Sequence, residues 1–370
     1  ILPGRPRQDR AMMRAPGFWW RSPGLGARLL QPLGALYGGV VARRMSRDGM
    51  RSPLPVICVG NFSAGGTGKT PFAIELAHHL MRMGERPAFL TRGYGGTYRG
   101  PIVVEASRHR ALDVGDEALL LARHATTVVA RARDAGARLA ESAGASVIVM
   151  DDGWQNPSLA KDFVFAMVDG ETGIGNGLCL PAGPLRAPLA AQWPFVQALV
   201  PVGFPGTSCR ALMEEAARRH ITVLEAKLVP DREAVEALRG RAVLAFAGIG
   251  RPEKFFASLR SLGALVVAEH GFGDHQPFEA RELAALAAKA RARDAILVTT
   301  EKDMVRVRDV VAVSDPARAD HRGSESAAIF DVSLRELPVR LQIEDETELD
   351  KLIATALFQR RSVGAHRADN

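Results

Sequence analysis

The chain has 370 residues and a net charge of +7, with 24% charged and 47% hydrophobic residues. These proportions are typical of a globular protein and exclude a disordered chain, and the length suffices for two domains. We find no stretch of about 18 uncharged apolar residues, which argues against a membrane span. Three isolated cysteines do not suggest a disulfide framework.

The N-terminal part is basic. Residues 1–13 are rich in Arg and Pro, and we expect them to be an extension outside the fold. Residues 14–47 contain several arginines but no acidic residue. Apolar residues recur here at spacings of three and four after an aromatic cluster: Phe18, Trp19, Trp20, Leu25, Leu29, Leu33, Leu36 and Val40. This pattern predicts an amphipathic helix, kinked or restarted at Pro32.

Four interpretations of this segment compete. A signal peptide is disfavoured by Arg28 within the apolar part. A helix docked on the protein's own core fits the amphipathicity. A nucleic-acid-binding arm is disfavoured because aromatic residues and leucines interleave with the arginines. The Trp pair and the lack of acids favour the fourth, a helix lying on an anionic membrane surface.

Residues 55–75 contain a strand, a glycine-rich loop and a helix. Val56–Val59 is a β-branched run, and the helix is expected from Thr70. The loop ends in Gly-Lys-Thr, although the strict Walker pattern would have glycine at Ser63, and related deviant loops would have lysine at Ala64. We expect the phosphates of a nucleoside triphosphate to contact Ser63, Ala64, Gly65, Gly66, Thr67, Gly68, Lys69 and Thr70. In this arrangement Lys69 reaches the β- and γ-phosphates and Thr70 holds Mg²⁺.

Strand-like and helical segments then alternate along the chain. The expected strands are 88–91, 102–104, 128–130, 147–150, 198–202, 242–247, 265–268 and 296–299, and the expected helices are 118–124, 208–220, 252–262 and 277–292. This alternation predicts α/β architecture: a P-loop-type, doubly wound, mostly parallel sheet and a second, smaller α/β domain. The expected units are a membrane anchor (14–47), a P-loop domain (48–220), a linker (221–240), a smaller domain (241–345) and a C-terminal helix and tail (346–370), with a surface loop at 314–326.

Asp151 and Asp152 end an apolar strand, as the acids of a Walker B segment do. Taken alone, an Asp pair is more often a cap or a turn. With a phosphate loop in the same sheet we expect both to serve Mg²⁺, because that ion prefers hard oxygen ligands.

A second chemical pair is the carboxylate of Asp116 with the imidazole of His275. Asp116 and Glu117 could simply be acids in a helix's first turn, and His275 a solvated turn residue. If the pair shares one cleft, Asp116 accepts the proton of an acceptor hydroxyl, and His275 orients it or relays the proton. Four arginines in loops at the same expected edge would suit an anionic substrate: Arg92, Arg131, Arg133 and Arg186.

From about Arg14 to about Ile353 the chain resembles the tetraacyldisaccharide 4'-kinases, the lipid A 4'-kinases of Gram-negative bacteria. The motifs are Gly60-Asn61 through Gly-Gly-Thr-Gly-Lys-Thr-Pro71, Thr91-Arg-Gly-Tyr-Gly95, Val114-Gly-Asp-Glu117, Asp151-Asp-Gly-Trp-Gln155, Gly175-Asn-Gly177, Pro181-Ala-Gly-Pro-Leu-Arg186, Asp274-His275 and Thr300-Glu-Lys-Asp303. The chain departs from many members at Asn156, where they have His, and at Ala187, where they have Glu.

The resemblance implies transfer of the ATP γ-phosphoryl group to the 4'-hydroxyl of an acylated glucosamine disaccharide 1-phosphate. It implies a peripheral enzyme on the cytoplasmic face of the inner membrane, using ATP and Mg²⁺. The partners are then the lipid and an anionic membrane surface; we expect no nucleic acid and no obligate protein partner. Catalytic roles would fall on Asp116, His275 and Lys69, and substrate contacts on Arg92, Tyr94, Glu117, Arg131, Asn176 and Arg186. The competing hypothesis is a membrane-associated P-loop ATPase switch that acts on a protein partner.

Overall fold

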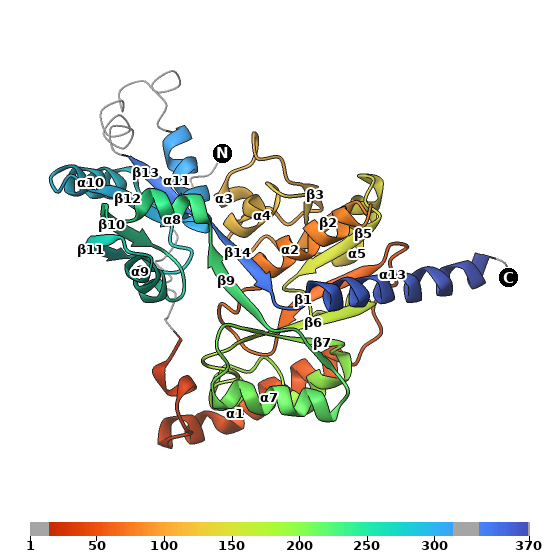
Figure 1. The fold of residues 1–370 in the computed structure, drawn as a ribbon. Coiled ribbons are helices and arrows are strands. Elements are labelled where there is room, and N and C mark those ends of the chain that lie inside the picture. Colours follow the sequence, from red (N-terminus) through yellow and green to blue (C-terminus); the bar gives the residue numbers. More distant parts are fainter. Residues whose placement is uncertain (1–14, 314–332, 369–370) are drawn as a thin grey trace, which may run out of the picture.

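The computed structural model describes residues 15–313 and 333–368. The expected extension (1–13) and surface loop (314–326) lie outside the described residues. The chain forms a large sheet and a smaller one, each covered by helices on both faces, with the smaller unit at the upper left of Figure 1. The predicted α/β fold with mostly parallel sheets is confirmed.

The large sheet has ten strands among the described residues, in the order β14-β9-β7-β6-β1-β5-β2-β4-β3, with β8 paired to β7. Only the β3–β4 and β14–β9 pairs are antiparallel. The strands are β1 (Val56–Asn61), β2 (Pro87–Thr91), β3 (Ile102–Val103), β4 (Thr126–Val129), β5 (Val147–Asp151), β6 (Phe163–Asp169), β7 (Ala198–Val202), β8 (Thr222–Val223), β9 (Ala226–Pro230) and β14 (Val339–Ile343).

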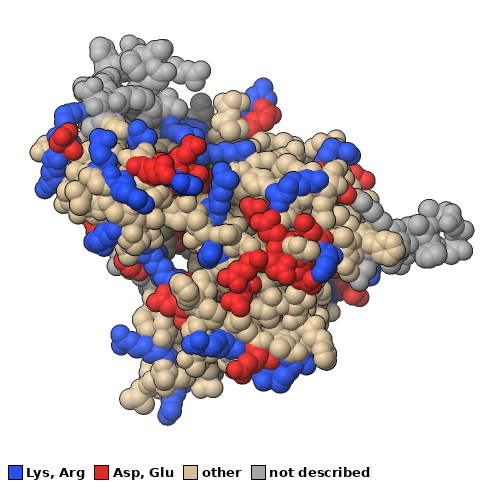
Figure 2. Space-filling model, viewed as in Figure 1, with Lys and Arg blue, Asp and Glu red and all other residues tan. Residues whose placement is uncertain are grey.

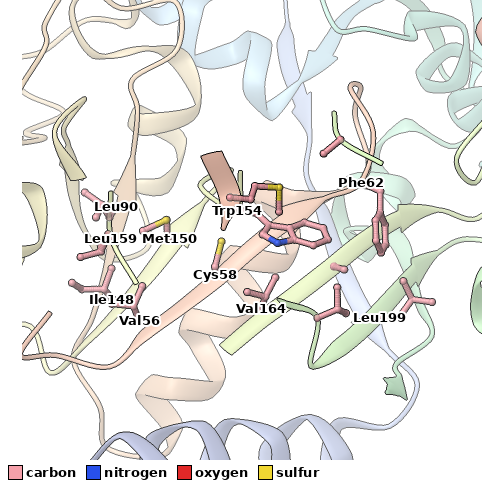
Figure 3. Packing of buried hydrophobic residues seen from close by; sticks show 14 of the residues in the cluster. Val56, Cys58, Phe62, Leu90, Ile148, Met150, Trp154, Leu159, Val164 and Leu199 are labelled. Atoms are coloured by element: carbon pink, nitrogen blue, oxygen red, sulfur yellow. The ribbon is translucent and has the colours of Figure 1, made fainter. Parts of the chain in front are cut away.

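Helices cover both faces of this sheet. They are α1 (Leu25–Met45), α2 (Lys69–Arg82), α3 (Ala111–Val114), α4 (Asp116–Leu121), α5 (Arg133–Ser142), α6 (Leu189–Gln192), α7 (Thr207–Arg218) and α13 (Glu346–Ala368), with 3₁₀ turns η1 (Gly17–Trp20) and η2 (Trp193–Phe195). Because side chains alternate along a strand, Ile57 and Val59 pack under α2 and α13, whereas Val56 and Cys58 join the core beneath α1, α5 and α7 (Figure 3).

The smaller sheet is entirely parallel, with the order β11-β10-β12-β13. Its elements are α8 (Arg232–Leu238), β10 (Ala242–Ala247), α9 (Pro252–Ser261), β11 (Leu265–Gly271), α10 (Ala280–Arg291), β12 (Ile296–Thr300), α11 (Glu301–Val313) and β13 (Leu334–Leu337). Helices α10 and α11 cover one face, and α8 and α9 the other.

Strands β9 and β14 connect the two units. The chain leaves the large sheet through β9 and returns through its antiparallel partner β14 (Figure 1). We expected residues 221–240 to be a linker and the smaller domain to extend over residues 241–345. By sheet membership, β8, β9 and β14 instead extend the large sheet, so the smaller unit ends before Val339. The sequence did not reveal that the chain returns to the large sheet, because the paired strands β9 and β14 lie more than a hundred residues apart.

Candidate active site

The glycine-rich loop connects β1 to α2 at the carboxyl edge of the large sheet. Gly65 and Gly68 have φ angles of 125° and 79°, which side chains other than glycine rarely adopt. The first helical hydrogen bond of α2 runs from Phe72 N–H to Gly68 O (3.0 Å), so the preceding amides lie at a free helix N-terminus. The amide of Ala64, one of the expected phosphate contacts, instead donates to Pro184 O at 2.7 Å.

Asp151, the last residue of β5, lies beside this loop. Its Oδ2 accepts a hydrogen bond from the Thr70 hydroxyl at 3.4 Å, and its Oδ1 is buried with no hydrogen-bond partner. Burial, followed by the charges of Glu117 and Asp152, raises the pKa of Asp151. A divalent cation would satisfy the orphaned oxygen and favour the charged form, so Thr70 and Asp151 fit Mg²⁺.

No cluster of three or more His, Cys, Asp or Glu side chains suited to a metal occurs within the described parts of the chain.

Asp152 has different partners from its neighbour. Arg186 Nη1 and Nη2 bind its two carboxylate oxygens at 2.6 and 3.0 Å, and Lys69 Nζ lies 4.0 Å from Oδ1. Burial alone would raise the pKa of Asp152, but Lys69 and Arg186 lower it to about 2. Asp152 is therefore a charged anchor for Arg186, with the Lys69 ammonium 4.0 Å away, while Asp151 keeps a free oxygen.

Asp116 and His275 meet where the two units touch. Asp116 begins α4 of the large unit and is 3% exposed, whereas His275 follows β11 of the smaller unit. His275 Nδ1 lies 3.0 Å from both carboxylate oxygens of Asp116. Sequence analysis predicted this pair, and the structure places its two side chains in contact.

Two cations accompany the pair. Arg306 Nε lies 3.6 Å from Asp116 Oδ2, and Lys302 Nζ lies 3.0 Å from Glu117 Oε1. Burial would raise the pKa of Asp116, but the hydrogen bond to His275 and the charges of Lys302, His275 and Arg306 lower it to about 2. Asp116 is thus a carboxylate at neutral pH. The Glu117 charge also helps to raise the pKa of Asp151.

Other predicted residues lie around the same edge. The Tyr94 ring packs edge-on against His275 with a centroid distance of 5.2 Å. Arg92 follows β2 and Arg131 follows β4, and both are exposed. Arg133 is instead buried, and its guanidinium donates to Ala130 O at 3.0 Å.

Asn176 has a scaffolding position. Its side-chain amide donates to Ala182 O at 2.9 Å and to Phe18 O at 3.4 Å, and its backbone amide donates to Trp19 O. These bonds attach the loop before α6 to η1. Both side-chain N–H groups of Asn176 are therefore bonded within the protein, so neither is free for the substrate contact that we expected.

Sequence analysis did not assign roles to Lys302 and Arg306, although both lie in or next to the Thr300–Asp303 motif. On a helix with many charged residues they resemble a solvated face. In the structure, Arg306 is buried and donates to Gly248 O and Gln276 O within the smaller unit, whereas Lys302 is partly buried where α11 packs against α4. The apolar contact of Val305 with Ala118 and Leu119 supports that packing.

The sequence model of the family described as "Tetraacyldisaccharide-1-P 4'-kinase" matches residues 26–357. Proteins named tetraacyldisaccharide 4'-kinase are similar over most of their length. That of Methylobacterium sp. (strain 4-46) is 56% identical over 82% of this chain and 91% of its own. That of Methylorubrum extorquens (strain PA1) is 53% identical over 93% of this chain and 99% of its own.

Among solved structures, the "apo" form of LpxK from Aquifex aeolicus in complex with ATP is similar in fold. Its TM-score is 0.62 at 24% sequence identity, covering 90% of this chain and 99% of that one.

Proposed function

The chain belongs to the tetraacyldisaccharide-1-phosphate 4'-kinase family, and from this premise we propose that it transfers the γ-phosphoryl group of ATP to the 4'-hydroxyl of a tetraacylated glucosamine disaccharide 1-phosphate. One observation carries the proposal: a phosphate loop, a carboxylate with a free buried oxygen and the Asp116 carboxylate in contact with His275 share one edge of the fold. Lipid A biosynthesis is the corresponding pathway.

The loop of residues 63–70 binds the phosphates of ATP. The free amides at the start of α2 donate to phosphate oxygens, and the Lys69 ammonium, 4.0 Å from Asp152 Oδ1, lies close enough to the loop to bind them as well. Thr70 and Asp151 would hold Mg²⁺, and the ion would supply charge neutralisation at the phosphates. Arg186 is held by Asp152 on the same side, and its guanidinium is suited to a phosphate of either substrate.

Asp116 is the base that accepts the proton of the 4'-hydroxyl. Its low pKa makes it a weak base in the free protein. A loose transition state for phosphoryl transfer needs little proton abstraction early on, so a well-placed charged carboxylate suffices. Tyr94, in edge contact with His275, and the exposed Arg92 and Arg131 lie where the sugar or its 1-phosphate can be contacted.

Helix α1 rests on the cytoplasmic surface of the inner membrane. Its exposed apolar side chains lie on one side of the helix: Leu25, Leu29, Leu33, Leu36 and Val40, of which Leu25 is 81% exposed. The opposite side, which includes Gly34 and Gly38, packs closely against Cys179. Such a helix, with one face docked and the other apolar, suits the interface of a bilayer.

The charge around α1 fits an anionic lipid surface. Arg43 and Arg44 lie in the last turn of the helix, and Arg21 and Arg28 lie near its start. Figure 2 shows Lys and Arg side chains along the lower edge of the molecule, where α1 and α7 lie in Figure 1. Among the described residues, no helix combines the length and apolarity that crossing a bilayer requires.

Acceptor dependence of ATP turnover tests this function. Purified protein is incubated with ATP and Mg²⁺, with and without the disaccharide 1-phosphate lipid in mixed micelles, and ADP release is followed. A kinase releases ADP only when the lipid is present. Equal ADP release without the lipid would contradict the proposal and favour the ATPase switch. An otherwise identical lipid already phosphorylated at the 4'-position is the control, because it lacks the acceptor hydroxyl.

A further inference from the structure

Lys302 contacts the outer nitrogen of His275. Its Nζ lies 3.1 Å from His275 Nε2 and 3.0 Å from Glu117 Oε1. Lys302 is the second residue of α11, so it reaches His275 from within the smaller unit and Glu117 across the boundary between the two units. His275 therefore lies between two partners, Asp116 at Nδ1 and Lys302 at Nε2.

The Lys302 ammonium at Nε2 and the Asp116 carboxylate at Nδ1 both favour a ring hydrogen on Nδ1 of His275. Burial would lower the pKa of Lys302, but Glu117, Asp116 and Asp274 hold it above its usual value. Lys302 is thus an ammonium group, which donates hydrogen bonds and accepts none. In neutral His275, Nε2 must then be the acceptor, and the ring hydrogen lies on Nδ1.

One nearby group would favour the opposite tautomer. Asp274 Oδ1 lies 3.8 Å from His275 Nε2, and a carboxylate there would prefer hydrogen on Nε2. That distance is too long for a hydrogen bond, whereas the 3.1 Å contact with Lys302 is within range. At Nδ1, both Asp116 oxygens lie at 3.0 Å, so this nitrogen faces acceptors only.

We propose that Lys302 is a positioning residue that fixes His275 in the Nδ1–H tautomer, so that His275 orients the Asp116 carboxylate and does not accept its proton. The inference deepens the proposed function and rests on it for the role of Asp116. Glu117 holds the Lys302 ammonium in place and so supports the Asp116–His275 pair indirectly.

The proton and electron balance of the transfer then follows. The 4'-oxygen forms its bond to the γ-phosphorus while the bond from that phosphorus to the bridging oxygen breaks, and the electron pair leaves with ADP. The hydroxyl proton moves to a carboxylate oxygen of Asp116. It stays there until it exchanges with solvent, because Nδ1 of His275 already carries a hydrogen.

The tautomer can be measured without substrate. We would record imidazole ¹⁵N spectra of the full chain in detergent micelles at neutral pH, and assign His275 by the signals lost in His275→Gln. The proposal expects a protonated Nδ1 and an unprotonated Nε2 in the wild type. In Lys302→Met it expects a larger fraction of the Nε2–H form, because only Asp116 then favours hydrogen on Nδ1, whereas Lys289→Met, which removes an exposed lysine of α10, leaves the signals unchanged. An Nε2–H tautomer in the wild type would overturn the proposal.

Kinetics supply a second readout. Lys302→Met should lower kcat by roughly tenfold or more with little change in KM for the lipid, as when an orienting partner is lost. Lys302→Arg, which can still donate to Nε2, should recover part of kcat and the Nδ1–H signal. Wild-type kcat together with an unchanged tautomer in Lys302→Met would refute the idea. If wild-type protein showed no acceptor-dependent turnover, the kinase proposal would fail, while the spectra would still decide the tautomer.

Discussion

Replacing Asp116 with Asn keeps the size of the side chain and removes its negative charge from a site lined by Lys302 and Arg306. Asn can still accept the hydrogen bond from His275 Nδ1. Lys302 and Arg306, however, lose one of the carboxylates that compensate their charge, and keep Glu117 and Asp303. We therefore expect Asp116→Asn to weaken the contact between the two units as well as the chemistry.

The pKa of Asp116 gives the size of the effect on stability. The folded protein lowers this pKa from 3.8 to about 2. That change corresponds to roughly 2.5 kcal/mol of stability for a buried carboxylate. A lowered pKa means that the stabilisation is present above about pH 4, where the unfolded chain is also ionised, and is lost as the pH falls through about 2.

Urea unfolding of wild type and Asp116→Asn at pH 7 and pH 3 measures this contribution. We expect the free energy of unfolding to be lower in the variant by roughly 2.5 kcal/mol at pH 7, and by about half as much at pH 3. Asp134→Asn is the control, because its ion pair with Arg138 is exposed and should contribute little.

The same variant should lose kcat by about 10²- to 10⁴-fold, the range for removal of a general base, with the affinity for ATP and Mg²⁺ unchanged. A variant as stable as the wild type at pH 7 would refute the electrostatic reasoning. Near-normal kcat would refute the assignment of Asp116 as the base.

Three further predictions follow from the phosphate loop, the metal side and α1. Lys69→Met should lower kcat/KM by at least about 100-fold in the ADP-release assay, because a charged group that binds phosphate is lost. A smaller effect would contradict the assignment of Lys69 to the phosphate loop. Asp151→Asn should abolish turnover yet raise the free energy of unfolding of the ligand-free protein by roughly 1 kcal/mol, because it removes a buried charge; urea unfolding showing destabilisation would argue against this. Leu29→Glu combined with Leu36→Glu should prevent co-sedimentation with phosphatidylglycerol-containing vesicles, whereas Leu228→Glu, on β9, should not; retention of the double variant would point to another membrane contact.

Local patterns predicted much of the fold. The loop after β1 was readable because Gly65 and Gly68 occupy positive-φ positions and β-branched residues precede them. The central strand Phe163–Asp169 was missed because both of its faces are buried. Its run of apolar residues lacks the alternation that identifies a half-exposed strand.

Contacts between distant segments limited the prediction of the site. The residue types of Asp116 and His275 suggested a pair, but only the docking of the smaller unit brings them to 3.0 Å. Lys302 and Arg306 carried no local signal, since their environment is formed by distant segments: α4 beside Lys302, and the loops at Gly248 and Gln276 around Arg306. The preference of Asp152 for Arg186, which leaves Asp151 available, likewise depends on side-chain geometry that a sequence pattern does not contain.

Mass analysis of the lipid product tests the central claim most directly. The wild-type protein would be given Mg²⁺, ATP labelled with ¹⁸O in the γ-phosphoryl group, and the tetraacylated disaccharide 1-phosphate, and the product would be fragmented to locate the label. The account predicts one labelled phosphate on the 4'-oxygen of the distal glucosamine, absent with Asp116→Asn. Label at any other position, or label found only in free phosphate, would contradict it.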